Sequence, residues 1–217
     1  MTAAEILVRG CVCSLPTDLT LIASAFGIKL VDFAACERKF QESHEELYGR
    51  LGLSFRTEEG EYVCAVNEKI CHTPRRFWTQ AHEMAHILLG HLELPPDPRQ
   101  ERDADALAAD LLAPLTVLHF CGVSSAAEVE RLCGISAQAS EIRFRQLTER
   151  RRTQAELYRQ SAVLLSAAAK DLFLGGAYEP QLFARFSPFI SRHIAERSRH
   201  DNYEHYLLRR CAETRLN

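Results

Sequence analysis

The sequence has no hydrophobic run long enough to cross a lipid bilayer. Its longest apolar stretch covers residues 161–169 and ends at Lys170 and Asp171, whereas a transmembrane helix needs about 20 apolar residues. The N-terminus carries Glu5 early and has no basic segment followed by an apolar one, the pattern of a secretory signal peptide. We therefore expect a cytoplasmic protein with no membrane partner.

The eight cysteines include no Cys-x-x-Cys pair, the usual spacing of a structural zinc site built from thiolates. Cys11 and Cys13 lie too close in sequence for a comfortable mutual disulfide, and Cys71-His72 is a weak metal signal. Disulfides are rare in the cytosol. We therefore predict that all eight cysteines are structural or surface thiols.

The composition shows none of the bias of disordered, collagen-like or coiled-coil proteins. The 217 residues are 47% hydrophobic and 25% charged, which suits one large domain or a domain with an appendage. The net charge is −8 over residues 1–140 and +5 over residues 141–217. The basic C-terminal part could bind nucleic acid or an acidic partner, but we favour its docking on the acidic N-terminal part.

Periodicity predicts a helix and three strands in the first 70 residues. The helix has Thr17 or Asp18 as its cap and Gly27 as its stop. A turn at Glu58-Glu59-Gly60 joins the last two strands as a hairpin. Residues 37–49 are polar and leave helix and loop both open. The predicted helix covers residues 16–26, and the predicted strands cover 28–33, 51–57 and 61–67.

Helices follow to the end of the chain. One begins with Thr73 as cap and Pro74 in its first turn, and Gly90 stops it. The next has a capping box of Asp97 and Gln100. The remaining predicted helices form a pair at 126–150, divided around Cys133-Gly134-Ile135 with Ser136 as the second cap, and two stretches at 153–174 and 180–212.

These patterns predict an α+β fold with a small antiparallel sheet, followed by an all-α C-terminal part. We divide the chain into a domain at 1–120 and a helical region at 121–217.

The sharpest chemical feature is His82-Glu83-Met84-Ala85-His86. Residues four apart on a helix lie one turn above each other, so His82 and His86 can bind one metal ion. Glu83 lies beside His82 and can take a proton from a water molecule that the metal activates, as the general base of a metallopeptidase. Two surface histidines on an ordinary helix are the alternative, because so short a motif also arises by chance.

A catalytic zinc needs a third protein ligand and leaves one position open. Glu101 on the next helix can supply this ligand, and Asp105, one turn on, can accept a hydrogen bond from a ligand imidazole and fix its tautomer. Ala104 and Ala108 are small enough for the two helices to approach closely. Asp103 is the competing carboxylate, about 200° away from Glu101 around a regular helix. An unpaired, solvated acidic face is the remaining alternative.

His91 is a further candidate for the third ligand, but its position does not fit. The metzincin pattern has Gly at the eighth and a third His at the eleventh position of the motif. Gly90 and His91 take the ninth and tenth positions. His91, His72 and Tyr62 stay open as groups that could stabilise an oxyanion.

Three segments, YVCAVNEK, RRFWTQAHEMAHILLGH and ERDADALAADLLAP, carry these residues. Together they resemble the ImmA/IrrE family of metallopeptidase-like proteins, whose pattern is Glu-x-x-Ala-Asn followed by Phe-Ala and Leu-Leu-x-Pro. Asp105 stands where that family often has Asn, and Leu107 replaces the usual Phe. A weaker similarity continues through LCGISAQASEIRFRQL.

The resemblance implies a mostly helical zincin-like core of the gluzincin type, with Zn²⁺ held by His82, His86 and Glu101. It also implies an intracellular endopeptidase that cleaves one regulatory protein, typically a helix-turn-helix repressor of a mobile element or stress response.

The helix pair at 126–150 supports a rival hypothesis, a DNA-binding or protein-binding regulator with a non-catalytic metal site. Gln138, Arg143 and Arg145 could face a DNA groove, but Glu130 and Glu141 would face phosphates unfavourably. We favour packing against the core or docking of a substrate.

Overall fold

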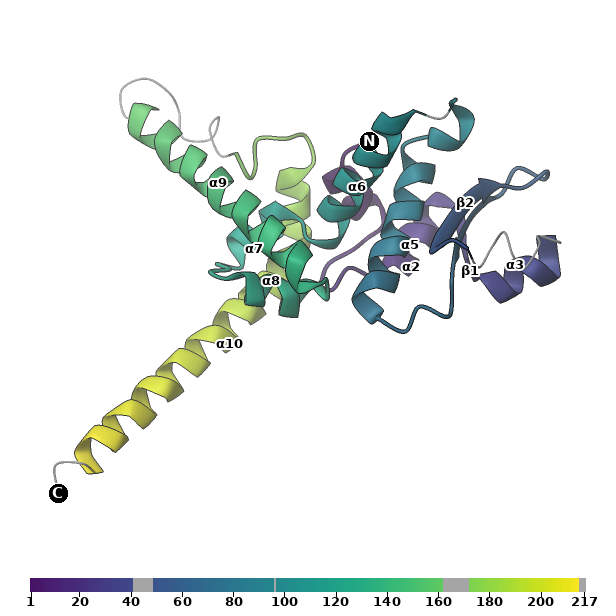
Figure 1. The fold of residues 1–217 in the computed structure, drawn as a ribbon. Coiled ribbons are helices and arrows are strands. Elements are labelled where there is room, and N and C mark those ends of the chain that lie inside the picture. Colours follow the sequence, from purple (N-terminus) through teal and green to yellow (C-terminus); the bar gives the residue numbers. More distant parts are fainter. Residues whose placement is uncertain (41–48, 96, 162–171, 215–217) are drawn as a thin grey trace.

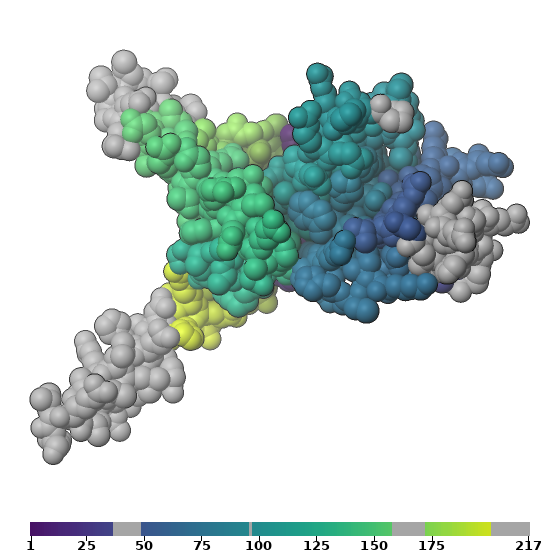
Figure 2. All heavy atoms as spheres, viewed as in Figure 1, coloured from purple at the N-terminus to yellow at the C-terminus, as the bar shows by residue number. Residues whose placement is uncertain are grey.

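The fold is α+β, as the sequence predicts, with a three-stranded sheet at one end of a largely helical molecule. The computed structural model describes residues 1–40, 49–95, 97–161 and 172–214, and it describes no side chains of 37–40, 158–161 and 201–214. Figure 1 shows the sheet on one side, with helices α9 and α10 diverging from the other, and Figure 2 shows the same arrangement with all heavy atoms. Among the described helices, none combines the length and apolarity that crossing a membrane requires.

The sheet has the strand order β1-β3-β2 and is mixed. β3 (Tyr62–Val66) pairs with β2 (Gly52–Arg56) in antiparallel fashion, which confirms the predicted hairpin. β1 (Ile28–Asp32) pairs with β3 in parallel, so our prediction of an antiparallel sheet is wrong for this strand. Alternating apolar and polar residues predict that a segment is a strand, but they do not predict the direction of the strand beside it. That direction depends on the long connection through α3 (Phe33–Phe40), which precedes β2.

Helix α5 (Thr73–Leu88) covers one face of the sheet, and α6 (Pro98–Leu112) packs beside it. The predicted capping box of α6 is confirmed. The cap of α5 is His72 and not Thr73, because the His72 Nδ1 accepts a hydrogen bond of 3.3 Å from the Arg75 N–H. Thr73 is instead the first helical residue.

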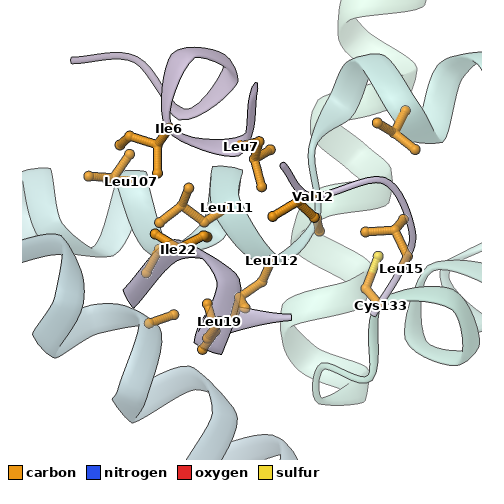
Figure 3. Packing of buried hydrophobic residues seen from close by; sticks show 14 of the residues in the cluster. Ile6, Leu7, Val12, Leu15, Leu19, Ile22, Leu107, Leu111, Leu112 and Cys133 are labelled. Carbon is orange, nitrogen blue, oxygen red and sulfur yellow. The ribbon is translucent and has the colours of Figure 1, made fainter. Parts of the chain in front are cut away.

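The N-terminal helices close the core behind α6. α1 (Ala3–Arg9) was not predicted, whereas α2 (Leu19–Phe26) has Asp18 as its cap and ends at Gly27 with φ of 65°. Figure 3 shows Ile6 and Ile22 from these two helices meeting Leu111 of α6. A short helical turn, η1 (His91–Glu93), follows Gly90.

The C-terminal part is helical, as predicted. α8 (Ala126–Cys133) ends at Gly134 with φ of 66°, and the Ser136 hydroxyl accepts a hydrogen bond near the start of α9 (Ala137–Ser161). α9 runs through the start of the helix predicted at 153–174, of which residues 162–171 lie outside the described part. The other two helices are α7 (Leu115–Phe120) and α10 (Glu179–Thr214).

One cluster of buried side chains extends from Ala4 in α1 to Ile190 in α10. It joins the helices that cover the sheet to the C-terminal helices. The division of the chain at residue 120 stays a prediction. Seven cysteines are free thiols, and the side chain of Cys211 lies outside the described residues.

Candidate metal centre

Helix α5 carries both histidines of the motif on one face. His82 and His86 lie one turn apart, with ring centroids separated by 4.8 Å and planes inclined by 68°. Ala81 and Ala85 of the same helix are fully buried. Because α6 presents small side chains in return, including the buried Ala108, the two helix backbones approach closely.

This approach brings Glu101 of α6 to both imidazole rings. The Glu101 carboxylate lies 3.3 Å from the His82 Nε2 and 3.5 Å from the His86 Nε2. The two Nε2 atoms are 3.1 Å apart. One donor atom from each of the three residues can be chosen so that all lie within 4.8 Å of one another. The three residues therefore form a possible metal-binding triad.

Asp105 contacts the other nitrogen of His82, at 2.9 Å from Nδ1. A carboxylate only accepts hydrogen bonds, so the proton of a neutral His82 belongs on Nδ1. The lone pair is then on Nε2, the atom that faces Glu101 and His86. The contact predicted for Asp105 is present, and it orients the ring for a cation.

His91 contacts His86 in the same way, with 3.1 Å between the two Nδ1 atoms. The sequence left His91 open only as an oxyanion stabiliser. Instead it touches the ring nitrogen of His86 that does not face Glu101. When the His86 Nε2 binds a cation, the proton of this ring is on Nδ1, which donates a hydrogen bond to the His91 Nδ1.

Burial is the largest cause of a lowered pKa at His86, and the neighbouring His82 adds to it, whereas Glu101 acts in the opposite direction. A lowered pKa keeps the imidazole neutral near pH 7. Neutral imidazole is the form that binds metals.

Glu83 faces the sheet rather than the two histidines. Its carboxylate accepts a hydrogen bond of 2.8 Å from the Ser54 hydroxyl on β2. Burial raises the pKa of Glu83, and the hydrogen bond from Ser54 and the nearby His82 oppose this increase. Glu101 raises it further, so Glu83 lies within electrostatic reach of the triad.

Gly52 makes the position of Glu83 possible. A Cβ atom at Gly52 would lie 2.6 Å from the Thr79 Cγ2 and 2.7 Å from the Glu83 Cγ. Neither distance is compatible with van der Waals contact, so strand β2 can approach α5 this closely only with glycine. Sequence reasoning missed Gly52 and Ser54. The available signal was a glycine inside a strand, which often marks a close backbone approach.

Other candidates from the sequence lie elsewhere. Asp103 is exposed and is not in the triad. The Tyr62 hydroxyl donates a hydrogen bond of 2.6 Å to Glu93. His72 caps α5, about 15 Å along the helix from His82 at 1.5 Å per residue.

The helix pair at 126–150 packs on α6 through Arg143. This side chain is 5% exposed, and its guanidinium donates hydrogen bonds to Asp110 at 2.8 Å and to the Ala113 carbonyl at 3.1 Å. Arg143 therefore does not face outward as the DNA-binding alternative requires. Arg145 and Gln138 are exposed.

No protein-family model matches the chain, and no curated protein matches its sequence.

Proposed function

We propose that this chain is a zinc-dependent endopeptidase, with His82, His86 and Glu101 as metal ligands and Glu83 as the general base. The observation that carries the proposal is the convergence of two imidazole nitrogens and a carboxylate from two packed helices. The resemblance to the ImmA/IrrE family supports the same assignment and a zincin-like core of the gluzincin type. It also supports an intracellular substrate, a helix-turn-helix repressor.

The donor set fits zinc. Ligands at 2.0–2.1 Å from a tetrahedral zinc lie about 3.3 Å from one another. The His82 and His86 Nε2 atoms are 3.1 Å apart, and the two oxygens of the Glu101 carboxylate lie 3.3 Å from the first and 3.5 Å from the second. Two histidines and one carboxylate make three protein ligands, the number typical of catalytic rather than structural zinc.

Bound zinc supplies Lewis-acid activation of a peptide carbonyl and of a water molecule. Asp105 and His91 hold the two imidazole rings with their Nε2 lone pairs toward the centre. Glu83 accepts the proton of the attacking water and passes it to the departing amine. Partial burial of Glu83 favours this role, because a carboxylate with a raised pKa is a stronger base.

Strand β2 offers a way to hold the substrate. Within the described ranges, β2 pairs only with β3, so its other edge has no strand partner. An extended peptide can add to such an edge through main-chain hydrogen bonds. Because Ser54 and Glu83 join β2 to α5, a peptide bound there lies beside the base.

The rival DNA-binding regulator lacks such support. The burial of Arg143 removes one of the three side chains that would contact DNA. A purely structural zinc would have no use for the carboxylate of Glu83.

The test is metal analysis of the purified protein, followed by incubation with candidate repressor proteins. Wild-type protein should bind one zinc per chain and cleave its substrate. Glu83→Gln should retain zinc and lose cleavage, whereas Glu101→Ala should lose both. Undiminished cleavage by Glu83→Gln would exclude this mechanism.

A further inference from the structure

A groove of about 430 Å³ lies between the start of α5 and the turn that joins α8 to α9. Arg75 and Trp78 of α5 form one side, and Ile135, Ala139 and Ile142 form the other. Ile142 is 41% exposed, so its side chain is accessible from the groove.

The groove continues the face of α5 that carries the metal triad. Arg75, Trp78, His82 and His86 follow one another at spacings of three, four and four residues, so they form one stripe along the helix. At a rise of 1.5 Å per residue, Trp78 precedes His82 by about 6 Å and Arg75 precedes it by about 10 Å.

The charge in the groove has one sign. Arg75 is exposed at its edge and His72 lies beside it, and among the described residues no carboxylate lines the groove. The apolar surface of Trp78 and Ile142 suits a large aliphatic or aromatic side chain. The adjacent guanidinium of Arg75 suits a carboxylate of the bound peptide. The opposite end of the stripe, at the metal triad, carries the negative charge of Glu101 instead.

We propose that this groove binds the substrate chain next to the cleaved bond, accepting an apolar side chain nearer to the triad and an acidic one farther from it. An extended peptide advances about 3.3 Å per residue, so Trp78 is two residues and Arg75 three residues away from the triad. The proposal rests on the proposed peptidase function for its substrate. Binding in the groove itself requires no metal.

The binding test uses Trp78, the single tryptophan of the chain, as its reporter. The probes are two capped tetrapeptides, Ala-Leu-Glu-Glu and Ala-Leu-Lys-Lys, titrated into the full chain while tryptophan emission is recorded. We expect a saturable change with the acidic peptide and about fivefold weaker binding of the basic one, the size of effect expected of an exposed ion pair.

Two variants with matched controls locate the effect. Arg75→Glu should reverse the preference between the peptides, whereas Arg76→Glu should not, because Arg76 lines a different hollow beside β1. Ile142→Asn should weaken binding of both peptides by about tenfold, the scale expected for losing one apolar contact. Ile194→Asn, on α10 and 45% exposed, is its control and should bind like wild type. Each altered side chain is exposed, so these variants should fold.

The proposal is overturned if neither peptide changes the emission, if Arg75→Glu leaves the preference unchanged, or if a short DNA duplex changes the emission more strongly than the acidic peptide. A cleavage profile separates it from the proposed function. Cleavage that depends on Glu83 but shows no preference two or three residues from the cut bond would refute the groove alone. Selective peptide binding without any cleavage would refute the peptidase alone.

Discussion

The Ser54 hydroxyl on β2 lies 2.8 Å from the Glu83 carboxylate on α5, so the edge strand of the sheet holds the side chain that we propose as the general base. This hydrogen bond fixes one oxygen of the Glu83 carboxylate. The position of the base thus depends on a strand that is remote from the motif in sequence.

Replacing Ser54 tests this dependence. Ser54→Ala should lower kcat about tenfold, the lower end of the effect of losing an orienting hydrogen bond beside a metal site. Zinc content should not change, because Ser54 contacts no proposed ligand. Ser54→Thr keeps the hydroxyl and is the control. Equal loss of zinc and activity in Ser54→Ala would show that the residue supports the metal instead.

Gly52 should tolerate no side chain. In Gly52→Ala, the new Cβ meets Thr79 and Glu83 at 2.6–2.7 Å, so β2 must move away from α5. Overpacking of this kind costs about 1–3 kcal/mol of unfolding free energy. Urea denaturation measures the loss. The control is Gly176→Ala, where the atoms nearest to the new Cβ belong to the movable carboxylate end of Glu179.

Asp105 should contribute to metal affinity although it is not a proposed ligand. Asp105→Ala removes the acceptor at the His82 Nδ1, and the ring loses its fixed orientation. We expect zinc affinity to fall about 10–100-fold, measured by competition with a chelator. Asp103→Ala, on the same helix but outside the triad, should bind zinc like wild type. If Asp103→Ala lost zinc affinity and Asp105→Ala did not, Asp103 and not Asp105 would support the metal site.

The local elements could be predicted from the sequence because their signals are local. Asp18 and Gly27 delimit α2, and Asp97 with Gln100 delimits the start of α6, as cap chemistry requires. The approach of Glu101 to His82 is also predictable, since the small Ala104 and Ala108 favour close packing of the two helices.

What the sequence did not predict depends on contacts between distant segments. The parallel pairing of β1 with β3 leaves no mark on the alternation of either strand. The contact of Ser54 with Glu83 joins residues 29 positions apart, and neither residue type signals the other. In the sequence, Arg143 resembles an exposed cation of a helix pair. Only the fold brings it to its acceptors at the end of α6.

Arg143 should stabilise the fold rather than bind DNA. Its guanidinium satisfies the Ala113 carbonyl at the end of α6, where helical carbonyls have no partner within the helix. Arg143→Met should lower the unfolding free energy by about 1–3 kcal/mol, because that carbonyl loses its hydrogen bond. Chemical denaturation measures the change, and the exposed Arg145→Met is the control. A stable Arg143→Met variant with weakened duplex binding would favour the DNA-binding alternative.

Stability should also depend on pH through His193 of α10. This side chain is 7% exposed, and its Nε2 is buried without a hydrogen-bond partner among the described residues. Burial, followed by Arg131 of α8 and then Arg197 of α10, lowers its pKa, whereas Glu128 and Glu196 act against this. The neutral form is therefore favoured in the folded protein.

The direction of the effect follows from the lowered pKa of His193. Above the ordinary histidine pKa of about 6.5, the residue is neutral in both states and has no effect on the pH dependence of stability. As the pH falls below that value, the unfolded chain takes up a proton first, so the folded state loses stability until His193 is protonated in both. Urea midpoints between about pH 7.5 and pH 5 measure this loss. His193→Phe keeps an aromatic ring beside Phe189, whose ring centroid lies 6.5 Å from that of His193. The new side chain cannot be protonated. The variant should therefore show a smaller loss, and an equal one would assign the acid sensitivity to other groups.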